Sequence, residues 1–265
     1  MNRIDKMFAE RRAAGKKSFV GFVTAGDPDI ETTCALVREL EKAGAALVEL
    51  GVPFSDPIAE GAVIQEANIR ALSNGINLDI IMDAVEKLRN DTQIPLVYLM
   101  YYNSVLSYGL DNFFSRCAEA GIDGVIIPDL PFEECGEIAE YTEKYGVYQI
   151  SLVSPSSTDE RLEKIARNAK GFLYCVSSMG VTGVRESFST DFDHMFKVLN
   201  SFSDVPKCIG FGISKPEQVR ELKHYCDGVI VGSAIVRLAA AGKDREEKVK
   251  SVSEYVRGMC AALDE

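Results

Sequence analysis

Eight short apolar segments recur along this chain, and stretches with helical periodicity separate them. Segments that are apolar on both faces are typical of parallel strands in a sheet that is covered on both sides. Between them, apolar residues return at helical spacing, for example at Ile81, Val85 and Leu88. The pattern predicts eight strand-helix units, with strands at residues 19–24, 46–52, 95–100, 123–127, 147–153, 171–176, 206–211 and 227–231.

Signals for helix ends agree with this alternation. Asn77 is placed to cap a helix that starts at the next residue, while Gly44, Gly75 and Gly121 each fall just past an apolar periodic stretch. No linker or low-complexity tract interrupts the series. We therefore expect a single domain over residues 1–265.

Eight parallel βα units in 265 residues are typical of a closed (β/α)8 barrel, the TIM-barrel class of α/β fold. Active sites of such barrels lie at the carboxyl ends of the strands. The alternative is an open, doubly wound sheet, which in its dinucleotide-binding form carries Gly-x-Gly-x-x-Gly after the first strand. Residues 24–28, Thr-Ala-Gly-Asp-Pro, make a turn without that spacing, so the barrel is favoured.

Charge and composition restrict the partners of the chain. The net charge of -11 disfavours nucleic acid or an anionic membrane surface, although a local pocket can still bind a small anion. No apolar stretch approaches the roughly 18 to 20 residues of a membrane span, and the charged start Met-Asn-Arg-Ile-Asp-Lys lacks a signal-peptide core. We expect a cytoplasmic protein whose partners are small molecules or proteins.

The cysteines and histidines indicate neither a disulfide framework nor a metal site. The seven cysteines are scattered without CxxC spacing, and Cys175 and Cys208 lie in apolar runs, where cysteine behaves as a small hydrophobic residue. His194 and His224 are the only histidines, and both follow ordinary helical surface patterns. We expect buried thiols, no metal and no Ser/His/Asp triad.

One carboxylate, Glu49, interrupts the second apolar strand. Burying an unpaired carboxyl group is costly and can raise its pKa by roughly 3 to 5 units. A pKa near the operating pH suits proton transfer, so Glu49 is predicted to be a general acid or base at the barrel mouth. The alternative is a structural acid paired with a buried base. Glu60, in the following loop, is a second catalytic candidate, with a solvated loop charge as its alternative.

Glycines gather at the predicted ends of the last three strands. They occur in Ser-Ser-Met-Gly-Val-Thr-Gly at 177–183, Gly-Phe-Gly-Ile-Ser at 210–214 and Val-Gly-Ser-Ala-Ile at 231–235. Glycine lets the backbone approach an anion closely, and Ser233 would open a short helix whose free N–H groups and dipole favour phosphate. Each glycine alone could simply end a strand, but the three together predict a phosphate site made of neutral backbone donors.

Five motifs along the chain together indicate a family. They are Phe-Val-Thr-Ala-Gly-Asp-Pro at 22–28, Val-Glu-Leu-Gly-Val-Pro-Phe-Ser-Asp-Pro at 48–57, Ile-Pro-Asp-Leu-Pro at 127–131, Gly-Val-Thr-Gly at 180–183 and Gly-Phe-Gly-Ile-Ser at 210–214. With them the chain resembles the tryptophan synthase α subunit family over nearly its whole length, in the family's order and spacing. The resemblance implies cleavage of indole-3-glycerol phosphate to indole and glyceraldehyde 3-phosphate. It also implies that Glu49 is the general acid/base, and that Gly183, Gly212, Gly232 and Ser233 bind the phosphate.

The chain departs from the family pattern at Glu60, where the family has an aspartate that stabilises positive charge at the indole nitrogen. Glutamate keeps the charge but adds a C–C bond of about 1.5 Å. A misplacement near 1 Å can cost about 10²-fold in rate. The rate of the reaction therefore depends on whether the pocket has adjusted to this longer side chain.

The resemblance implies further binding residues. Tyr174 matches a tyrosine near the catalytic glutamate, and Thr182 belongs to a segment, 177–190, with the composition of a lid. Asp56 and Asp129 stand at loop-strand junctions, where the resemblance suggests loop ordering and partner contact and the simpler alternative is turn formation. Five residues match positions that pack the indole ring, although apolar side chains there serve equally as core: Phe22, Ile64, Leu99, Phe211 and Ile213.

The resemblance implies a lyase with no cofactor of its own in an αββα assembly, docked through the loops after the second and sixth strands onto a β subunit that carries pyridoxal phosphate. Two alternatives stay open. Another phosphosugar barrel enzyme, of the isomerase or indole-glycerol-phosphate synthase type, would usually need a lysine or cysteine at a strand end, and we expect none inside the predicted strands. A chain weakened by Glu60 would act mainly as an allosteric or binding subunit.

Overall fold

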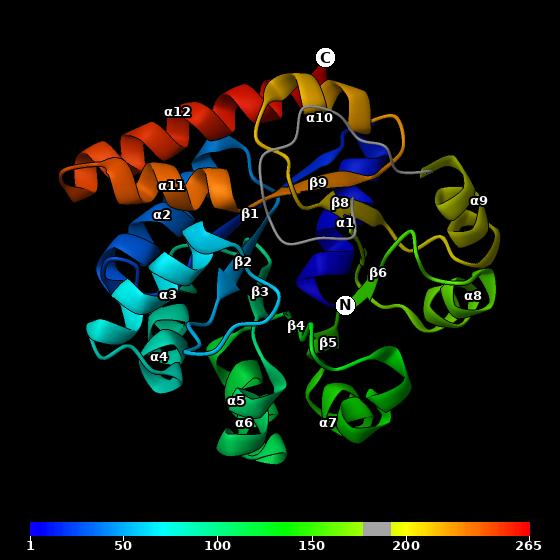
Figure 1. The fold of residues 1–265 in the computed structure, drawn as a ribbon, viewed down its shortest axis with the longest axis horizontal. Coiled ribbons are helices and arrows are strands. Elements are labelled where there is room, and N and C mark those ends of the chain that lie inside the picture. The colour runs from blue at the N-terminus through cyan, green and yellow to red at the C-terminus, as the bar shows by residue number, and fades with distance from the viewer. Residues whose placement is uncertain (177–191) are drawn as a thin grey trace.

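The chain folds into a barrel of parallel strands surrounded by helices, shown in Figure 1 from a computed structural model that describes residues 1–176 and 192–265. The strands are β1 (Ser18–Thr24), β2 (Leu47–Gly51), β3 (Leu96–Leu99), β4 (Gly124–Ile126), β5 (Tyr148–Gln149), β6 (Ser151–Val153), β7 (Leu173–Val176), β8 (Lys207–Gly210) and β9 (Gly228–Val231). They pair in parallel in the order β5-β4-β3-β2-β1-β9-β8-β7-β6. This is the predicted (β/α)8 arrangement, and we infer that it forms one domain.

The barrel closes at Ile150, the single residue between β5 and β6. The Ile150 N–H donates to the carbonyl of Val125 on β4, at 2.9 Å, whereas Ser151 pairs with Leu173 on β7. The strand predicted at 147–153 is therefore divided in two. Strands of a closed barrel are tilted and staggered, so this strand does not pair with both neighbours over the same residues. The other seven predicted strands lie within two residues of their predicted bounds.

Helices cover the outside of the barrel, and Figure 1 shows them as a ring around the strands. The ring contains one very short helical turn, η1 (Phe132–Glu134), before α7. The helices are α1 (Arg3–Ala13), α2 (Ile30–Ala43), α3 (Ala62–Ser73), α4 (Leu78–Leu88), α5 (Tyr102–Tyr108), α6 (Leu110–Ala120), α7 (Gly136–Tyr145), α8 (Asp159–Asn168), α9 (Phe192–Phe202), α10 (Pro216–Leu222), α11 (Ser233–Ala241) and α12 (Arg245–Asp264).

The predicted helix ends are confirmed. The side chain of Asn77 accepts the N–H of Ile80 at 3.0 Å and so caps α4. Gly44 and Gly121 end α2 and α6 with φ of 107° and 88°, a left-handed conformation that favours glycine. Gly75 lies one residue past the C-cap of α3 with φ of 76°.

The strands separate two apolar layers. Side chains on their outer faces pack against the helices, for example Val48 and Leu50 of β2. Side chains on their inner faces fill the barrel, because successive residues of a strand point to opposite faces. The interior layer consists of Ile4, Phe8, Val20, Leu47, Val97, Ile126, Ile150, Phe172, Tyr174, Cys208 and Ile230.

Helix α1 closes the amino-terminal end of the barrel. Its only buried side chains, Ile4 and Phe8, belong to the interior layer, and the Phe8 ring lies 5.9 Å from the ring of Phe172. In Figure 1, α1 lies at the centre of the ring of helices. The barrel is therefore filled from below, and its open end lies at the carboxyl ends of the strands.

The expectation of buried thiols is confirmed for four of the seven free cysteines, Cys117, Cys175, Cys208 and Cys226. It is wrong for Cys34, Cys135 and Cys260, which are only partly buried. His194 is exposed on α9, whereas His224 is exposed in the turn after α10 and not on a helix. Over residues 1–176 and 192–265, no group of side chains is arranged to hold a metal ion. In the same ranges, every helix is too short or too polar to cross a membrane.

We expect Phe8→Ala to lower the free energy of unfolding by about 3 to 5 kcal/mol, because it leaves a cavity beneath the barrel. Chemical denaturation followed by circular dichroism measures this loss. The matched control is Lys6→Ala on the exposed face of α1, which should change stability by less than about 0.5 kcal/mol. Equal midpoints for the two variants would show that α1 does not complete the core.

Candidate active site

A cavity of about 380 Å³ opens at the carboxyl ends of the strands. It is lined by eleven of the residues predicted from the sequence: Phe22, Glu49, Glu60, Ile64, Leu99, Tyr174, Phe211, Gly212, Ile213, Gly232 and Ser233. Side chains from β1, β2, β3 and β7 meet there with the turns that follow β8 and β9 and with helices α3 and α11. The remaining predicted ligands, Thr182 and Gly183, lie outside the described residues.

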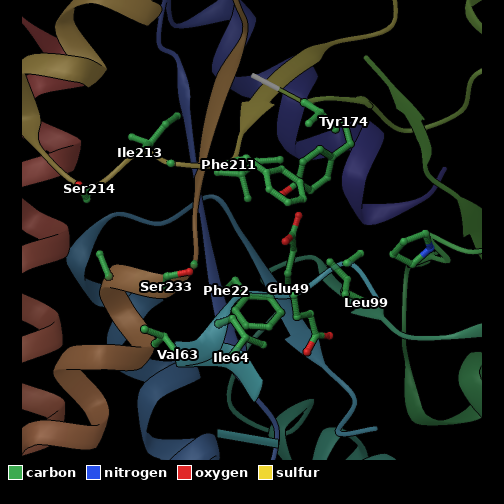
Figure 2. Close-up of a pocket in the computed structure, with 18 of the residues that line it drawn as sticks. Phe22, Glu49, Val63, Ile64, Leu99, Tyr174, Phe211, Ile213, Ser214 and Ser233 are labelled. Atoms are coloured by element: carbon green, nitrogen blue, oxygen red, sulfur yellow. The ribbon is translucent and has the colours of Figure 1, made fainter. Parts of the chain in front are cut away.

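Strand alternation aims Glu49 into the barrel. On β2, Leu47 belongs to the interior layer while Val48 and Leu50 face the helices. Glu49 therefore shares the inner face with Leu47, in register with Phe22 of β1 and Val97 of β3. Figure 2 shows its carboxyl group pointing into the pocket between the labelled aromatic side chains.

The carboxyl group of Glu49 is completely buried and has no partner in the part of the chain that the structure describes. Neither of its oxygens has a hydrogen-bond partner among the described residues. Desolvation raises the pKa of Glu49 to about 8, because the charged form cannot be solvated there. The alternative was that Glu49 is a structural acid paired with a buried base. No base in the described part of the chain contacts its carboxyl group. At neutral pH the group is mainly the neutral acid and can donate a proton.

Glu60 lines the same cavity and is held by a neighbour on α3. The side-chain amide of Asn68 donates to Glu60 Oε2 at 2.6 Å. Desolvation raises the pKa of Glu60, and the hydrogen bond from Asn68 opposes that rise. Glu60 is half-buried. It is thus a positioned carboxylate at the pocket wall, unlike a freely solvated loop charge.

Two residues that position Glu60 were missed in the sequence. Asn68 is 3% exposed on the buried face of α3, and a polar residue on that apolar face was the available signal. Tyr101, just after β3, accepts the N–H groups of Ile58 and Ala59 on its hydroxyl at 3.1 and 3.0 Å. This fixes the loop that carries Glu60. No spacing in the sequence links Tyr101 to that loop.

The turns after β8 and β9 form another part of the cavity wall. Phe211 and Gly212 have φ of 74° and 79°, and a positive φ at phenylalanine is an uncommon conformation that concentrates at functional sites. Gly232 is the N-cap of α11 and makes no side-chain cap, so the first N–H groups of α11, from Ser233 on, are available to a ligand. This geometry suits an anion.

Two glycines at strand ends, Gly51 and Gly210, make room for aromatic rings. An added Cβ at Gly210 would lie 2.5 Å from the Tyr174 hydroxyl, so this glycine makes room for Tyr174. A Cβ at Gly51 would likewise meet the ring of Phe22. The Tyr174 and Phe211 rings pack edge to face at 5.8 Å. The glycine at 210 is therefore explained by packing and not by ligand approach.

The two aspartates expected at the loops lie outside the cavity. Asp56 is exposed in the loop after β2 and accepts the hydroxyl of Ser55 at 2.5 Å. Asp129 accepts the N–H of Tyr102 on both carboxylate oxygens, at 2.9 and 3.2 Å, and thereby caps α5. Loop ordering by Asp129 is visible in this contact.

The fold and this cavity define an α/β-barrel protein with an active-site pocket at the carboxyl ends of its strands. The family model for the tryptophan synthase alpha chain matches residues 8–264. A tryptophan synthase alpha chain from Thermoanaerobacter sp. (strain X514) is 49% identical over 263 residues, covering 99% of this chain and 100% of the relative. One from Clostridium kluyveri is 44% identical over 264 residues and covers 100% of both chains.

Solved structures agree with these relatives. The alpha chain from Legionella pneumophila has a TM-score of 0.89 at 34% identity, covering 100% of this chain and 98% of that one. A chain in the Mycobacterium tuberculosis tryptophan synthase structure has a TM-score of 0.89 at 32% identity, covering 99% and 98%. The chain belongs to the tryptophan synthase alpha chain family.

The buried acid generates a prediction about stability. Glu49 ionises near its ordinary value of 4.5 when unfolded but near 8 when folded. Between these values the folded state binds more protons, so wild-type stability falls as pH rises from about 4.5 to about 8. Glu49→Gln cannot ionise, so its melting temperature should exceed that of the wild type by about 5 °C more at pH 8 than at pH 5.

Thermal unfolding at the two pH values measures this difference. The matched control is Glu221→Gln on the exposed surface of α10, for which the difference from wild type should be the same at both pH values. If Glu49→Gln follows the pattern of this control, Glu49 ionises normally in the folded protein.

Proposed function

We propose that this chain uses Glu49 and Glu60 to cleave indole-3-glycerol phosphate to indole and glyceraldehyde 3-phosphate, the lyase activity of the tryptophan synthase alpha chain in tryptophan biosynthesis. The observation that carries the assignment of residues is the unpaired carboxyl group of Glu49, which lies buried in the wall of the cavity. Its raised pKa gives a neutral acid at physiological pH.

The reaction needs two proton transfers, one from Glu49 to the substrate and one from the substrate back to Glu49. The acid form of Glu49 donates a proton to indole C3, which gives an indolenine-like cation. The resulting carboxylate then takes the proton of the hydroxyl on the adjoining side-chain carbon. As that hydroxyl becomes the aldehyde, the C–C bond to C3 breaks and its electron pair restores the neutral indole. Glu49 is protonated again at the end, and the atoms and charges balance.

Glu60 stabilises the intermediate. Protonation at C3 places positive charge on the indole nitrogen, and a fixed carboxylate nearby lowers the energy of that charge. The hydrogen bond from Asn68 holds one oxygen of Glu60, which leaves the other for the ring N–H. The apolar side chains at Phe22 and Leu99 offer the indole ring a surface next to these acids.

The phosphate lies at the other end of the cavity in this proposal. The N–H groups of Ser233 and of the turn at Gly212 would donate to its oxygens, together with Thr182 and Gly183 from the segment outside the described residues. The loop between Phe211 and Ile213 then carries both the phosphate donors and part of the wall for the ring. One substrate thus spans the pocket.

The alpha chain of tryptophan synthase carries no cofactor, and pyridoxal phosphate belongs to the beta chain, so proton transfer here relies on side chains alone. We place the beta chain against the loop after β2, where Asp56 and the 73% exposed Ile58 face solvent. An αββα assembly in the cytoplasm is the expected form.

The rival phosphosugar chemistries fit the cavity less well. Those enzymes need a lysine or cysteine at a strand end, and the described lining contains neither. The expectation that the strands contain neither residue type is wrong, because Cys175, Lys207 and Cys208 lie on them, but none of the three lines the cavity. The other alternative is a purely regulatory role for the chain. An assay of indole release from indole-3-glycerol phosphate, with and without the beta chain, tests it.

Glu49→Gln keeps the size of the side chain and removes its proton. We expect indole release from indole-3-glycerol phosphate to fall by at least about 10²-fold while the fold persists. In the wild type, kcat/KM should decrease as pH rises above about 8, because Glu49 then loses the proton it must donate. Full activity of the folded Gln variant would refute the assignment.

Substitutions at Glu60 test whether the pocket has adjusted to glutamate. If Asn68 holds the longer side chain in its working position, Glu60→Asp withdraws the carboxylate and lowers turnover by about tenfold, or about 1.4 kcal/mol of transition-state stabilisation. Glu60→Gln keeps the length and removes the charge, so its loss should be larger. A faster Glu60→Asp variant would mean that the pocket still suits aspartate, and equal rates for all three residues would remove Glu60 from the mechanism.

A further inference from the structure

The cavity has a marked separation of charge. Among its lining residues in the described ranges, the acids are Glu49 and Glu60, and the only cationic side chain is Arg237. Glu49 comes from β2 and Glu60 from the loop before α3, whereas Arg237 comes from α11. The single cation and the free N–H groups of α11 therefore occur on one helix, away from the strand that carries Glu49.

The geometry of α11 directs Arg237 toward its own amino terminus. Arg237 follows Ser233 by four residues, so the two side chains lie on the same face of the helix. Side chains of helical residues tilt toward the helix amino terminus, and the long arginine stem reaches back about one turn. The guanidinium can thus approach an anion placed at Ser233. Arg237 is exposed, and it makes no ion pair in the described part of the chain.

Ser214 supplies a second unused group. Its Oγ is buried in the cavity wall without a hydrogen-bond partner among the described residues. The rest of Ser214 is fixed, because its N–H donates to Gln218 Oε1 at 2.8 Å and its carbonyl accepts the hydroxyl of Tyr255 at 2.9 Å. A buried hydroxyl without a partner destabilises the fold, and a ligand that hydrogen-bonds to it would relieve that cost. Figure 2 shows Ser214, Ile213 and Ser233 on the same side of the pocket.

We propose that Arg237 and Ser214 complete the anion site, Arg237 as the counter-charge and Ser214 as a hydroxyl donor to the phosphate of the substrate. This inference rests on the proposed function, and it extends that function by naming what selects a phosphorylated substrate. Backbone donors alone would have to hold a dianion inside a chain of net charge -11 that also places two carboxylates in the same cavity. Arg237 offsets that repulsion at one end only, so it also orients the substrate with its indole ring toward Glu49.

The test compares variants in binding glycerol 3-phosphate by calorimetry and in cleaving indole-3-glycerol phosphate. Arg237→Gln should raise both the Kd for glycerol 3-phosphate and the KM by about tenfold, with kcat within about twofold and the affinity for unphosphorylated indole unchanged. Arg237→Lys should recover most of the loss. Added salt should weaken wild-type binding more than Arg237→Gln binding, because the variant lacks the charge that salt screens.

Ser214→Ala distinguishes a ligand-binding hydroxyl from a structural one. It should weaken glycerol 3-phosphate binding about threefold or more and raise the melting temperature of the free protein, since an unpaired buried hydroxyl is removed. A hydroxyl with a structural role would instead lower the melting temperature and leave affinity unchanged, which would overturn its part in the site.

Lys250→Gln on α12 is the matched control, because it removes one exposed positive charge outside the cavity. It should bind glycerol 3-phosphate as the wild type does. Equal affinity of Arg237→Gln and wild type overturns the inference and leaves the proposed function standing. If the wild type neither binds glycerol 3-phosphate nor releases indole, the inference and the proposed function both fail.

Discussion

The unpaired carboxyl group of Glu49 is the constraint on which the site depends. A charge at that point would cost several kcal/mol, and the protein avoids the cost by keeping the proton until about pH 8. The same desolvation that destabilises the ionised fold makes the acid effective near neutral pH. Stability and acid strength are therefore coupled at one side chain, and any mutation that admits water to the barrel mouth would lower the pKa of Glu49 and weaken the proton donor.

Packing throughout the barrel keeps water away from Glu49. Phe8 and Ile4 of α1 fill the lower end, and the inner faces of the strands supply apolar side chains up to the level of Tyr174. The glycines at 51 and 210 let aromatic rings pack at the ends of β2 and β8, where any larger residue would collide with them. Packing beneath the site thus sets the dielectric environment in which the acid works.

Much of this architecture is readable from the sequence because it follows from local pattern. Two-sided apolar runs predict the parallel strands, and a lone glutamate in one run predicts the acid. What the sequence does not contain is contact between distant segments. The bond from Asn68 to Glu60, the contact of Tyr101 with the loop before α3, and the break at Ile150 all depend on how the closed barrel brings loops and strands together. Arg237 likewise looks like any exposed helical arginine until the cavity beside it is known.

The separation of charge in the cavity explains how one small pocket can accommodate a dianion and a carboxylic acid. If the phosphate lay close to Glu49, its negative charge would raise the pKa of that acid further and would also oppose the later formation of its carboxylate. In the proposed site, the phosphate at α11 lies at the end of the substrate away from the indole ring, where helix N–H groups would pair with its charge. The proposed position of the phosphate would therefore do more than select a phosphorylated substrate. It would protect the ability of Glu49 to give up a proton and recover it within one catalytic cycle.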